Sequence, residues 1–223
     1  MSVADILRAV PLFADLQDEE IERISLHARN RTYPKGSVIV FEDDPGDALY
    51  VVVSGKVKVV LTGDDGREVI LATLTDNDFF GEMSLIDDEP RSAHVIAMDD
   101  ADLLVLRRED FQKRLHETPR IAIGLLGALC KRLRLADKKI GGLALLDVSG
   151  RVARLLVEMA DENDGVTVRR AITHHTIAQM IGSSRETVSR SISNMVDQGH
   201  IDVTRTTITI KNRPALEAAA GRG

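Results

Sequence analysis

The sequence predicts an α+β protein in which antiparallel β-structure, a long helix and a small helical domain with a β-hairpin follow one another. Three observations predict this fold class. Short β-branched runs separated by turn residues fill much of the first half of the chain. An apolar heptad seam marks the helix after them, and two helices that meet at a glycine precede a final hairpin.

The composition is that of a globular protein. The 223 residues include 29 Lys and Arg against 35 Asp and Glu, and 43% are hydrophobic, which excludes a disordered chain. No apolar run approaches the ~18 residues of a membrane span, and the start of the chain lacks the basic and apolar regions of a signal peptide. We therefore expect a cytoplasmic protein with no membrane partner.

Cysteine content and charge distribution narrow the function further. Cys130 is the single cysteine, which excludes an internal disulfide and a thiolate-held zinc or iron–sulfur cluster. Residues 147–223 carry ten Lys and Arg against nine Asp and Glu, whereas residues 1–146 carry 19 against 26. The chain therefore joins two segments of different character.

The first half of the chain changes from helical to strand periodicity. Residues 5–30 carry apolar side chains at helical spacing, interrupted by Pro11, which predicts short helices. The later β-branched runs are separated by short Gly- and Asp-rich turns, which is typical of an antiparallel barrel or sandwich. The predicted strands are Ser37–Phe41, Leu49–Val53, Lys56–Leu61, Glu68–Thr73, Ser92–Ala97 and Leu103–Leu106.

After Arg108-Glu109-Asp110 the chain reads as helical to about Leu146, with one break near Thr118–Pro119. The second part carries an apolar seam whose members lie alternately four and three residues apart, which is the a/d pattern of a coiled coil. A core helix on the barrel would show a wider stripe, so we expect a parallel homodimer, with a hinge near Gly141 and Gly142. The seam consists of Ala122, Leu126, Leu129, Leu133, Ala136, Ile140 and Leu143.

The C-terminal part has the pattern of a winged helix-turn-helix. Two helices meet at Gly182, and a β-hairpin with a short turn follows them. We expect the small-residue tail Pro214–Gly223 to be frayed. The predicted elements are the helices Arg151–Ala160, Thr173–Ile181 and Ser183–Asp197, and the strands Ile201–Val203 and Thr207–Ile210.

The segment between two of the predicted strands carries residues suited to a phosphate ester. Gly81 allows a tight turn, and the amides of the helical turn after it point toward an anion. Arg91 offers a two-pronged hydrogen bond to a phosphodiester, Ser92 adds a hydroxyl donor, and Glu82 accepts from a sugar hydroxyl. The alternative is a solvated loop in which Arg91 pairs with Asp87, Asp88 or Glu89.

A second cluster lies at the start of the helix after Gly182. The spacing of Arg185, Glu186 and Arg190 places all three near one helix face. Arginine bonds guanine in the major groove and glutamate accepts from cytosine, while Ser184 and Thr187 suit phosphate contacts. The alternative is a solvated surface helix on which Glu186 and Arg190 form an i,i+4 ion pair.

The run Phe80–Leu85 with Pro90-Arg91-Ser92-Ala93 resembles, spacing included, the phosphate-binding cassette of cyclic-nucleotide-binding domains. The resemblance implies that the strands form an antiparallel β-roll. It also implies the positions that hold the nucleotide, with Gly81 and Glu82 at the ribose and the cassette backbone, Met83 and Ser84 in the same cassette, and Arg91 and Ser92 at the cyclic phosphate.

The motif Gly-x-Ser-Arg-Glu-Thr-Val-x-Arg at residues 182–190, with the segment 145–153 before it, is similar to the recognition helix and hinge of the CRP/FNR family of bacterial transcription factors. The resemblance extends over about the whole chain. It implies a homodimeric regulator, not an enzyme, that is gated by cAMP and works with RNA polymerase. It also implies a pseudo-palindromic double-stranded DNA site with TGTGA-like half-sites. In this site Arg185, Glu186 and Arg190 would read the bases, and Ser184 and Thr187 would contact the DNA backbone.

The chain departs from this family in two places. The family's cAMP receptors commonly place Thr-Ser on the dimer helix to contact the adenine, where this chain has Ala136-Asp137. Asp137 either accepts a hydrogen bond from the base or forms an interhelical salt bridge. The identity of the base is therefore open, and cGMP and cyclic di-GMP stay as alternative effectors. A dimer that is active without effector is a further alternative. Thr173 is the expected helix cap, and His174-His175 after it replace the family's Arg-Gln.

These observations divide the chain into a cyclic-nucleotide-binding β-roll over residues 1–118, a dimerisation helix over 119–146 and a DNA-binding domain over 147–223. A cupin-like barrel enzyme with a DNA module is the rival interpretation. It fares poorly because His94 is the one histidine among the predicted strands, whereas such a site needs several metal ligands together. The six histidines show no ligand spacing, and we expect no metal.

Overall fold

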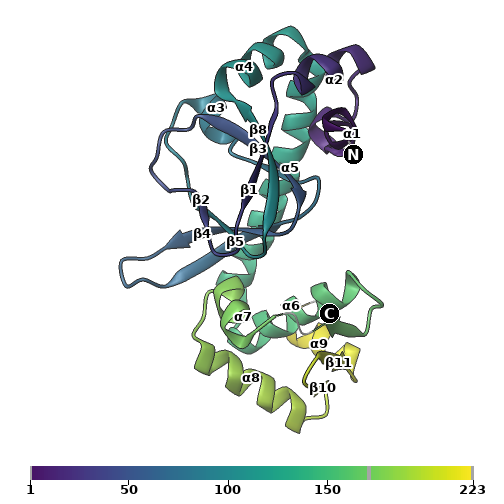
Figure 1. Ribbon diagram of the computed structural model, residues 1–223. Helices are drawn as coiled ribbons and strands as arrows, with labels where there is room; N and C mark the ends of the chain where they lie inside the picture. Colours follow the sequence, from purple (N-terminus) through teal and green to yellow (C-terminus); the bar gives the residue numbers. More distant parts are fainter. Residues whose placement is uncertain (1, 170–171, 222–223) are drawn as a thin grey trace. The chain divides into compact units, whose positions relative to one another are not determined.

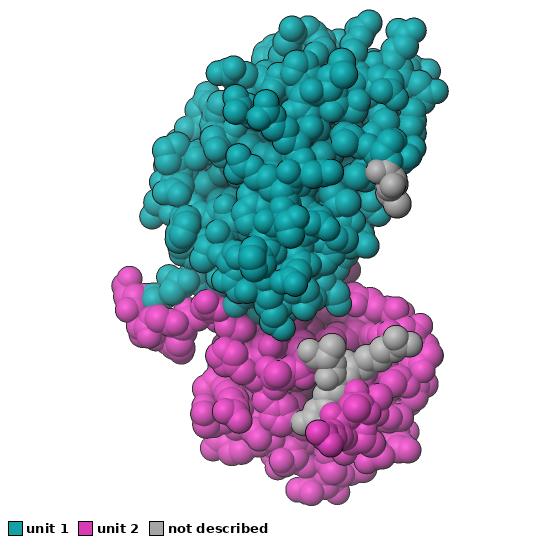
Figure 2. All heavy atoms as spheres, in the orientation of Figure 1, with its two compact units in different colours: residues 1–63, 70–134 teal, residues 64–69, 135–223 magenta. Residues whose placement is uncertain are grey.

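The computed structural model describes residues 2–169 and 172–221, which fold into two compact units. One unit comprises residues 1–63 and 70–134, and the other comprises residues 64–69 and 135–223 (Figures 1 and 2). Each unit has hydrophobic clusters of its own, as expected for domains that fold around separate cores.

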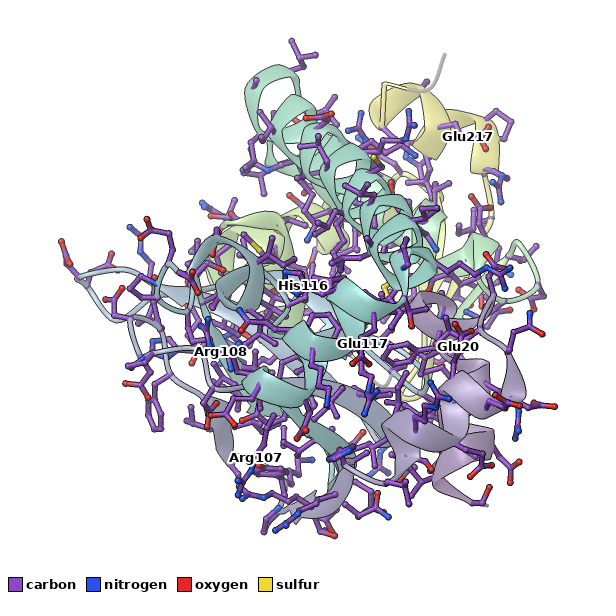
Figure 3. All side chains as sticks on the ribbon, turned by 90° about the horizontal axis from the view of Figure 1, so that it is seen from above. Glu20, Arg107, Arg108, His116, Glu117 and Glu217 are labelled. Atoms are coloured by element: carbon purple, nitrogen blue, oxygen red, sulfur yellow. The ribbon has the colours of Figure 1, made fainter. Side chains whose placement is uncertain are left out.

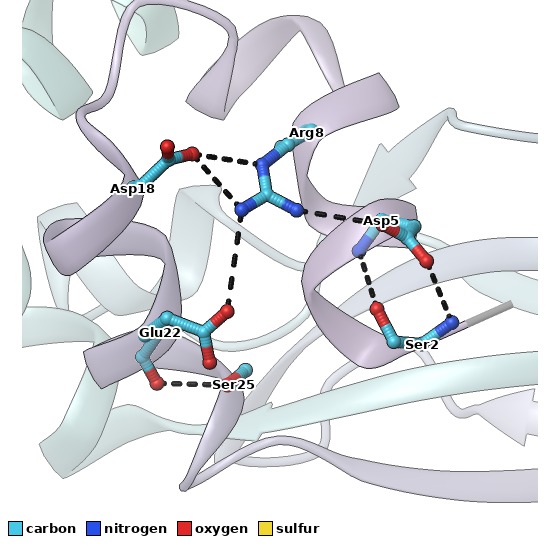
Figure 4. Close-up of polar contacts among 6 residues, drawn as sticks. All are labelled: Ser2, Asp5, Arg8, Asp18, Glu22 and Ser25. Carbon is cyan, nitrogen blue, oxygen red and sulfur yellow. Dashed lines mark hydrogen bonds and ion pairs between the residues drawn. The ribbon is translucent and has the colours of Figure 1, made fainter.

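The first unit opens with short helices, which confirms the prediction for this segment. Ser2 and Asp5 form a capping box at the first helix, in which each side chain accepts from the backbone N–H of the other. Arg8 then joins two helices, because its guanidinium bonds the carboxylates of Asp5 and Asp18 (Figure 4). The elements are α1 (Val3–Ala9), the 3-10 turn η1 (Pro11–Phe13) and α2 (Asp18–Ser25).

Eight strands follow in two four-stranded sheets of order β1-β8-β3-β6 and β2-β7-β4-β5. Described strand pairs run antiparallel in both sheets, so the predicted antiparallel β-structure is confirmed. The strands are β1 (Arg29–Tyr33), β2 (Val38–Val40), β3 (Ala48–Ser54), β4 (Val57–Thr62), β5 (Glu68–Leu74), β6 (Phe79–Phe80), β7 (His94–Ala97) and β8 (Ala101–Arg107).

All six predicted strands are confirmed, with ends that shift by no more than two residues. β1 and β6 have no counterpart in the prediction. The sequence of β1, Arg-Asn-Arg-Thr-Tyr, lacks apolar alternation, and its pairing with β8 defines it as a strand. β6 has only two residues, which is too short for a periodicity.

β8 separates two hydrophobic clusters, because successive side chains of a strand point to opposite faces. Leu104 and Leu106 pack with the N-terminal helices, whereas Leu103 and Val105 pack inside the barrel with Tyr50 and other strand residues. The sheet β1-β8-β3-β6, from which the chain leaves at β6 into the segment around Gly81, is therefore packed on both faces.

Three helices complete this part of the chain. α5 begins at Pro119 directly after Thr118, the C-terminal cap of α4, so the predicted break is confirmed. In the first unit α5 buries Ile121 and Leu125. Part of its heptad seam is exposed, with Leu126 at 62%, Leu133 at 63% and Ile140 at 62% relative exposure. Ala122 and Leu129 of the seam are half-buried, and Leu129 packs against the core of the first unit. The helices are α3 (Met83–Asp87), α4 (Arg108–Glu117) and α5 (Pro119–Leu145).

The second unit has the winged helix-turn-helix arrangement predicted from the sequence. Gly182, at φ +64°, ends the first helix of the motif in the left-handed conformation that glycine adopts readily. A three-stranded sheet of order β10-β11-β9 forms the wing. The elements are α6 (Val148–Asp161), β9 (Thr167–Arg169), α7 (His174–Ile181), α8 (Arg185–Asp197), β10 (Ile201–Val203) and β11 (Thr207–Ile210).

The expectation of a frayed tail at Pro214–Gly223 is wrong for its described part. Residues Arg213–Ala219 form a helix, α9, that begins at Asn212, whose side chain accepts from the backbone N–H of Ala215. Leu216 is fully buried in the core of the second unit, and its burial opposes fraying. Residues 222–223 lie outside the described part. No helix of the described residues is long and apolar enough to span a membrane.

Candidate functional site

The predicted cassette surrounds a sharp backbone turn after β6. Gly81 has φ +87°, and a Cβ at this position would lie 2.6 Å from Nη1 of Arg91. Glycine is therefore required here both for the backbone conformation and for the space that the arginine occupies. α3 follows at once and ends at Asp88, whose φ of +59° reverses the chain. This turn brings Arg91 back toward Gly81.

Arg91 is buried, with 4% relative exposure. Its Nη1 donates to the carbonyl of Gly81 at 2.7 Å, and its Nη2 donates to the carbonyl of Ala48 at 2.8 Å and lies 3.3 Å from Oδ1 of Asp47. A buried guanidinium held by two carbonyls is positioned for an anion in a way that a mobile surface arginine is not. The solvated-loop alternative for Arg91 is wrong.

Two stacked aromatic rings lie beside Arg91. Tyr50 of β3 stacks on Phe80 with ring centroids 4.9 Å apart and an interplanar angle of 3°. The guanidinium carbon of Arg91 lies 5.9 Å from the centroid of the Tyr50 ring. Burial raises the pKa of the Tyr50 phenol, and the carboxylate of Asp47 raises it further. Tyr50 is therefore a neutral, packed ring at physiological pH.

Glu82 is the second buried ionisable group, with 1% relative exposure. Its Oε1 accepts from Nη1 of Arg132 at 2.6 Å. Its Oε2 is buried and has no hydrogen-bond partner in the structure. A buried carboxylate oxygen without a donor is costly. This atom therefore marks a position where a ligand that brings a hydroxyl or amine would be stabilised.

Arg132 is a site residue that the sequence analysis missed. It comes from α5, donates to the carbonyl of Phe79 as well as to Glu82, and its guanidinium carbon lies 4.7 Å from the centroid of the Phe79 ring. In the sequence it follows Lys131 and flanks the heptad seam, so it reads as a solvated charge. Only the packing of α5 against the first unit could have revealed it.

The remaining predicted cassette residues have different positions. Ser92 and Met83 are exposed at its rim, with Oγ of Ser92 4.0 Å from Sδ of Met83. Ser84 is buried and its carbonyl accepts from Arg108, which makes it a structural part of the cassette. Ala136 and Asp137 are exposed on α5 in the second unit, so their contact with a base stays a prediction.

The residues predicted to read DNA lie in the second unit. Thr173 caps α7 by accepting from Thr176 N–H at 3.1 Å, and Ser184 caps α8 by accepting from Thr187 N–H at 3.2 Å. Arg185 and Glu186, in the first turn of α8, are exposed. The N-terminal ends of both helices are thus fixed by side chains that also carry hydroxyl groups.

Arg190 lies one turn further along α8. Its Nη2 donates to Oγ1 of Thr187 at 3.3 Å, and the ion pair with Glu186 expected of a plain surface helix is not formed between these two described residues. A shallow pocket of about 450 Å3 opens beside this helix. The pocket is lined by Ile172, Thr173, His174, His175, Arg185 and Arg205.

Arg205, in the turn between β10 and β11, is a second residue that the sequence analysis missed. Its place in this pocket with Arg185 brings the wing and the recognition helix to one surface. His94, by contrast, has its ring nitrogens engaged by one residue. Its Nδ1 accepts from Glu42 N–H at 3.0 Å and its Nε2 lies 3.5 Å from the Glu42 carboxylate. Over the described residues, no group of three or more potential metal ligands is found.

Two domain families match the chain. The cyclic nucleotide-binding domain matches residues 30–118, and the Crp-like helix-turn-helix domain matches residues 150–219. The first match includes the whole cassette, and the second includes α7, α8 and the wing.

Whole-length relatives are found among characterised regulators. The chain is 36% identical over 214 residues to the cyclic AMP receptor protein of Thermus thermophilus, which covers 96% of this chain and 98% of the relative. It is 29% identical over 221 residues to a CRP-like cAMP-activated global transcriptional regulator of Mycobacterium tuberculosis, which covers 97% of this chain and 99% of the relative.

Solved structures agree with these relatives. The c-di-GMP responsive global regulator CLP of Xanthomonas campestris aligns with a TM-score of 0.77 and 28% identity, over 87% of this chain and 99% of that one. The catabolite activator protein of Thermus thermophilus aligns with a TM-score of 0.55 and 36% identity, over 96% of this chain and 100% of that one. The similar proteins thus include regulators that respond to different nucleotides.

Proposed function

The chain belongs to the CRP/FNR family of transcription regulators, and on this premise we propose that it is a homodimeric transcription regulator whose DNA binding is controlled by cAMP. The single observation that carries the nucleotide part is the pair of buried groups in the cassette. The buried Arg91 and the unpartnered Oε2 of Glu82 together offer a cation and an acceptor.

A cyclic nucleotide has complementary chemistry to these two groups. Its cyclic phosphate is an anion that a positioned guanidinium binds with charge-assisted hydrogen bonds. Its ribose carries a free hydroxyl, which would donate to Oε2 of Glu82 and satisfy that buried atom. The hydroxyl of Ser92, at the exposed rim, adds a donor for the phosphate.

The choice of cAMP rests on two named relatives, the Thermus cyclic AMP receptor protein and the Mycobacterium cAMP-activated regulator. Cyclic GMP and cyclic di-GMP are the alternatives, and the name of the Xanthomonas regulator CLP favours testing the second. An ionised carboxylate such as that of Asp137 only accepts hydrogen bonds. It therefore suits the amino group of adenine and, in two places, the N–H edge of guanine.

The DNA-binding part follows from the exposed face of α8. Arg185 and Arg190 would bond guanine edges in the major groove, and Glu186 would accept from a cytosine amino group. Thr173, Ser184 and Thr187 present hydroxyl groups to the phosphate backbone. Two such faces in a dimer fit a pseudo-palindromic operator with TGTGA-like half-sites, where a cytoplasmic regulator would meet RNA polymerase.

The exposed part of the α5 seam supplies the dimer in this proposal. Leu126, Leu133 and Ile140 lie exposed at heptad spacing, and burial against a second copy would remove them from water. We assign the protein no catalytic reaction, since the named relatives are regulators.

Isothermal calorimetry tests the effector. The purified protein is titrated with cAMP, cGMP and cyclic di-GMP, and each titration is repeated on Arg91→Lys, which keeps the charge but cannot bond both carbonyls. The proposal expects binding of cAMP to the wild type and a loss of at least about tenfold in Arg91→Lys. The ratio of the cAMP and cGMP affinities is then compared between the wild type and Asp137→Ser. A ratio that is unchanged by the substitution excludes contact between Asp137 and the base.

A further inference from the structure

Arg108, the first residue of α4, bonds both the β2–β3 loop and α3 of the cassette. Its Nε donates to the carbonyl of Gly46 at 2.7 Å, and its Nη2 donates to the carbonyl of Ser84 at 2.7 Å. Its Nη1 pairs with Asp88, at the end of α3. The backbone N–H of Arg108 adds a fourth bond, to the carbonyl of Asp47 at 2.8 Å.

These contacts join two loops that are distant in the sequence and in direct contact in space. A Cβ at Gly46 would lie 2.3 Å from Cβ of Ser84 and 3.4 Å from Cζ of Arg91. The β2–β3 loop and α3 therefore approach as closely as a glycine allows. Both arginines bond groups on either side of this contact, since Arg91 donates to the carbonyls of Gly81 and Ala48 while Arg108 donates to those of Gly46 and Ser84.

We infer that Arg108 is a positioning residue for the nucleotide site. It holds the β2–β3 loop and α3 in the arrangement in which Arg91 and Glu82 face one ligand, although it does not touch that ligand itself. The inference rests on the proposed function, because positioning has a purpose only if the cassette binds a nucleotide. A preformed site binds more tightly than one that must be ordered on binding.

The residue type matters because the acceptors lie in different directions. A guanidinium carries five donors in a fixed fork, whereas an ammonium is a point charge on a flexible stem. Arg108→Lys would therefore keep the charge and lose most of the bridge. Gln112, one turn along α4, also donates to the carbonyl of Leu85 at 2.8 Å, so α4 grips α3 at two successive turns.

The neighbouring Arg107 provides a matched control (Figure 3). It is the last residue of β8 and is exposed, so Arg107→Gln removes the same charge at nearly the same place without breaking the bridge. The three variants Arg108→Gln, Arg108→Lys and Arg107→Gln separate hydrogen-bond geometry from simple attraction of an anionic ligand.

Two measurements on full-length protein test the inference. Hydrogen–deuterium exchange without nucleotide reports the order of residues 42–48 and 82–89, and calorimetry with cAMP, cGMP and cyclic di-GMP reports affinity at a temperature where every variant is folded. We expect faster exchange in both segments and at least about tenfold weaker nucleotide binding in Arg108→Gln. Arg108→Lys should show a smaller effect of the same kind, and Arg107→Gln should match the wild type.

Each other outcome has a distinct meaning. Unchanged exchange in Arg108→Gln would overturn the bridge between the two loops. Faster exchange with unchanged affinity would show that Arg108 is structural only and would overturn the positioning role. An equal loss of affinity in Arg107→Gln would show that charge alone matters, which also overturns it. If the wild type binds none of the three nucleotides, the proposed function fails, and the exchange data still decide whether the bridge exists.

Discussion

Arg132 of α5 and Glu82 of the cassette form an ion pair with Nη1 and Oε1 2.6 Å apart, while the other carboxylate oxygen of Glu82 is buried without a partner. The pair joins the nucleotide cassette directly to the helix that carries the heptad seam. A ligand that bonds the free oxygen would therefore act on a residue already in contact with α5.

Replacing Arg132 with glutamine should weaken the cassette. The variant leaves the Glu82 carboxylate buried without its cation, which should cost about 1–3 kcal/mol of the free energy of unfolding. Nucleotide affinity should fall as well. Lys131→Gln is the matched control, since Lys131 is exposed on the same helix. Chemical denaturation and calorimetry check both effects, and equal behaviour of the two variants would contradict a role for the Arg132–Glu82 pair.

Dimerisation should depend on the seam of α5 and not on every exposed leucine. Leu133→Asp places two like charges against each other in a parallel dimer, so this variant should sediment as a monomer where the wild type is dimeric. Leu135 is 52% exposed but lies off the seam. Leu135→Asp should therefore remain dimeric, and monomers from both variants, or from neither, would refute the seam.

The two arginines of the pocket on the second unit should have different roles, with Arg185 contacting a base and Arg205 contacting the DNA backbone. Arg185→Ala should cost about 1–3 kcal/mol on the cognate operator and much less on unrelated DNA, because it removes a contact to guanine. Arg205→Ala, in the wing, should weaken both DNAs alike. Fluorescence anisotropy with the two duplexes measures this difference. If Arg185→Ala loses the same amount of affinity for both duplexes, Arg185 contacts a phosphate and not a base.

Tyr50 should make stability sensitive to alkaline pH. Its pKa is raised in the folded state by burial and by Asp47, so the folded protein binds the phenolic proton more tightly than the unfolded chain does. This stability is fully present below the unfolded pKa of ~10 and is lost as pH rises through the folded value. Tyr50→Phe should flatten the fall in unfolding free energy above about pH 10, and an unchanged slope would count against this origin.

Local signals predicted most of the fold and the short segment that brings Arg91 to Gly81. The wing strands Ile201–Val203 and Thr207–Ile210 match the prediction residue for residue, because alternation and a short polar turn define a hairpin locally. Gly81, Glu82 and Arg91 come together as expected, since they lie in one short segment.

The features missed are those that tertiary packing creates. β1 is polar and exists through its pairing with β8, and α9 is ordered by the burial of Leu216. Arg132 and Arg108 contact the cassette across separations of 50 and 24 residues. A charged side chain on a helix reads as solvated unless its packing is known, so sequence patterns alone do not assign such residues to a site.

The central claim is that a cyclic nucleotide controls DNA binding by this protein. Its most direct test is the affinity of the wild type for a duplex with two TGTGA-like half-sites, measured by anisotropy with and without saturating cAMP. The account predicts that cAMP tightens binding by about tenfold or more, in the usual range of coupling between two sites. Equal affinity with and without cAMP, and likewise with cGMP and cyclic di-GMP, would contradict it.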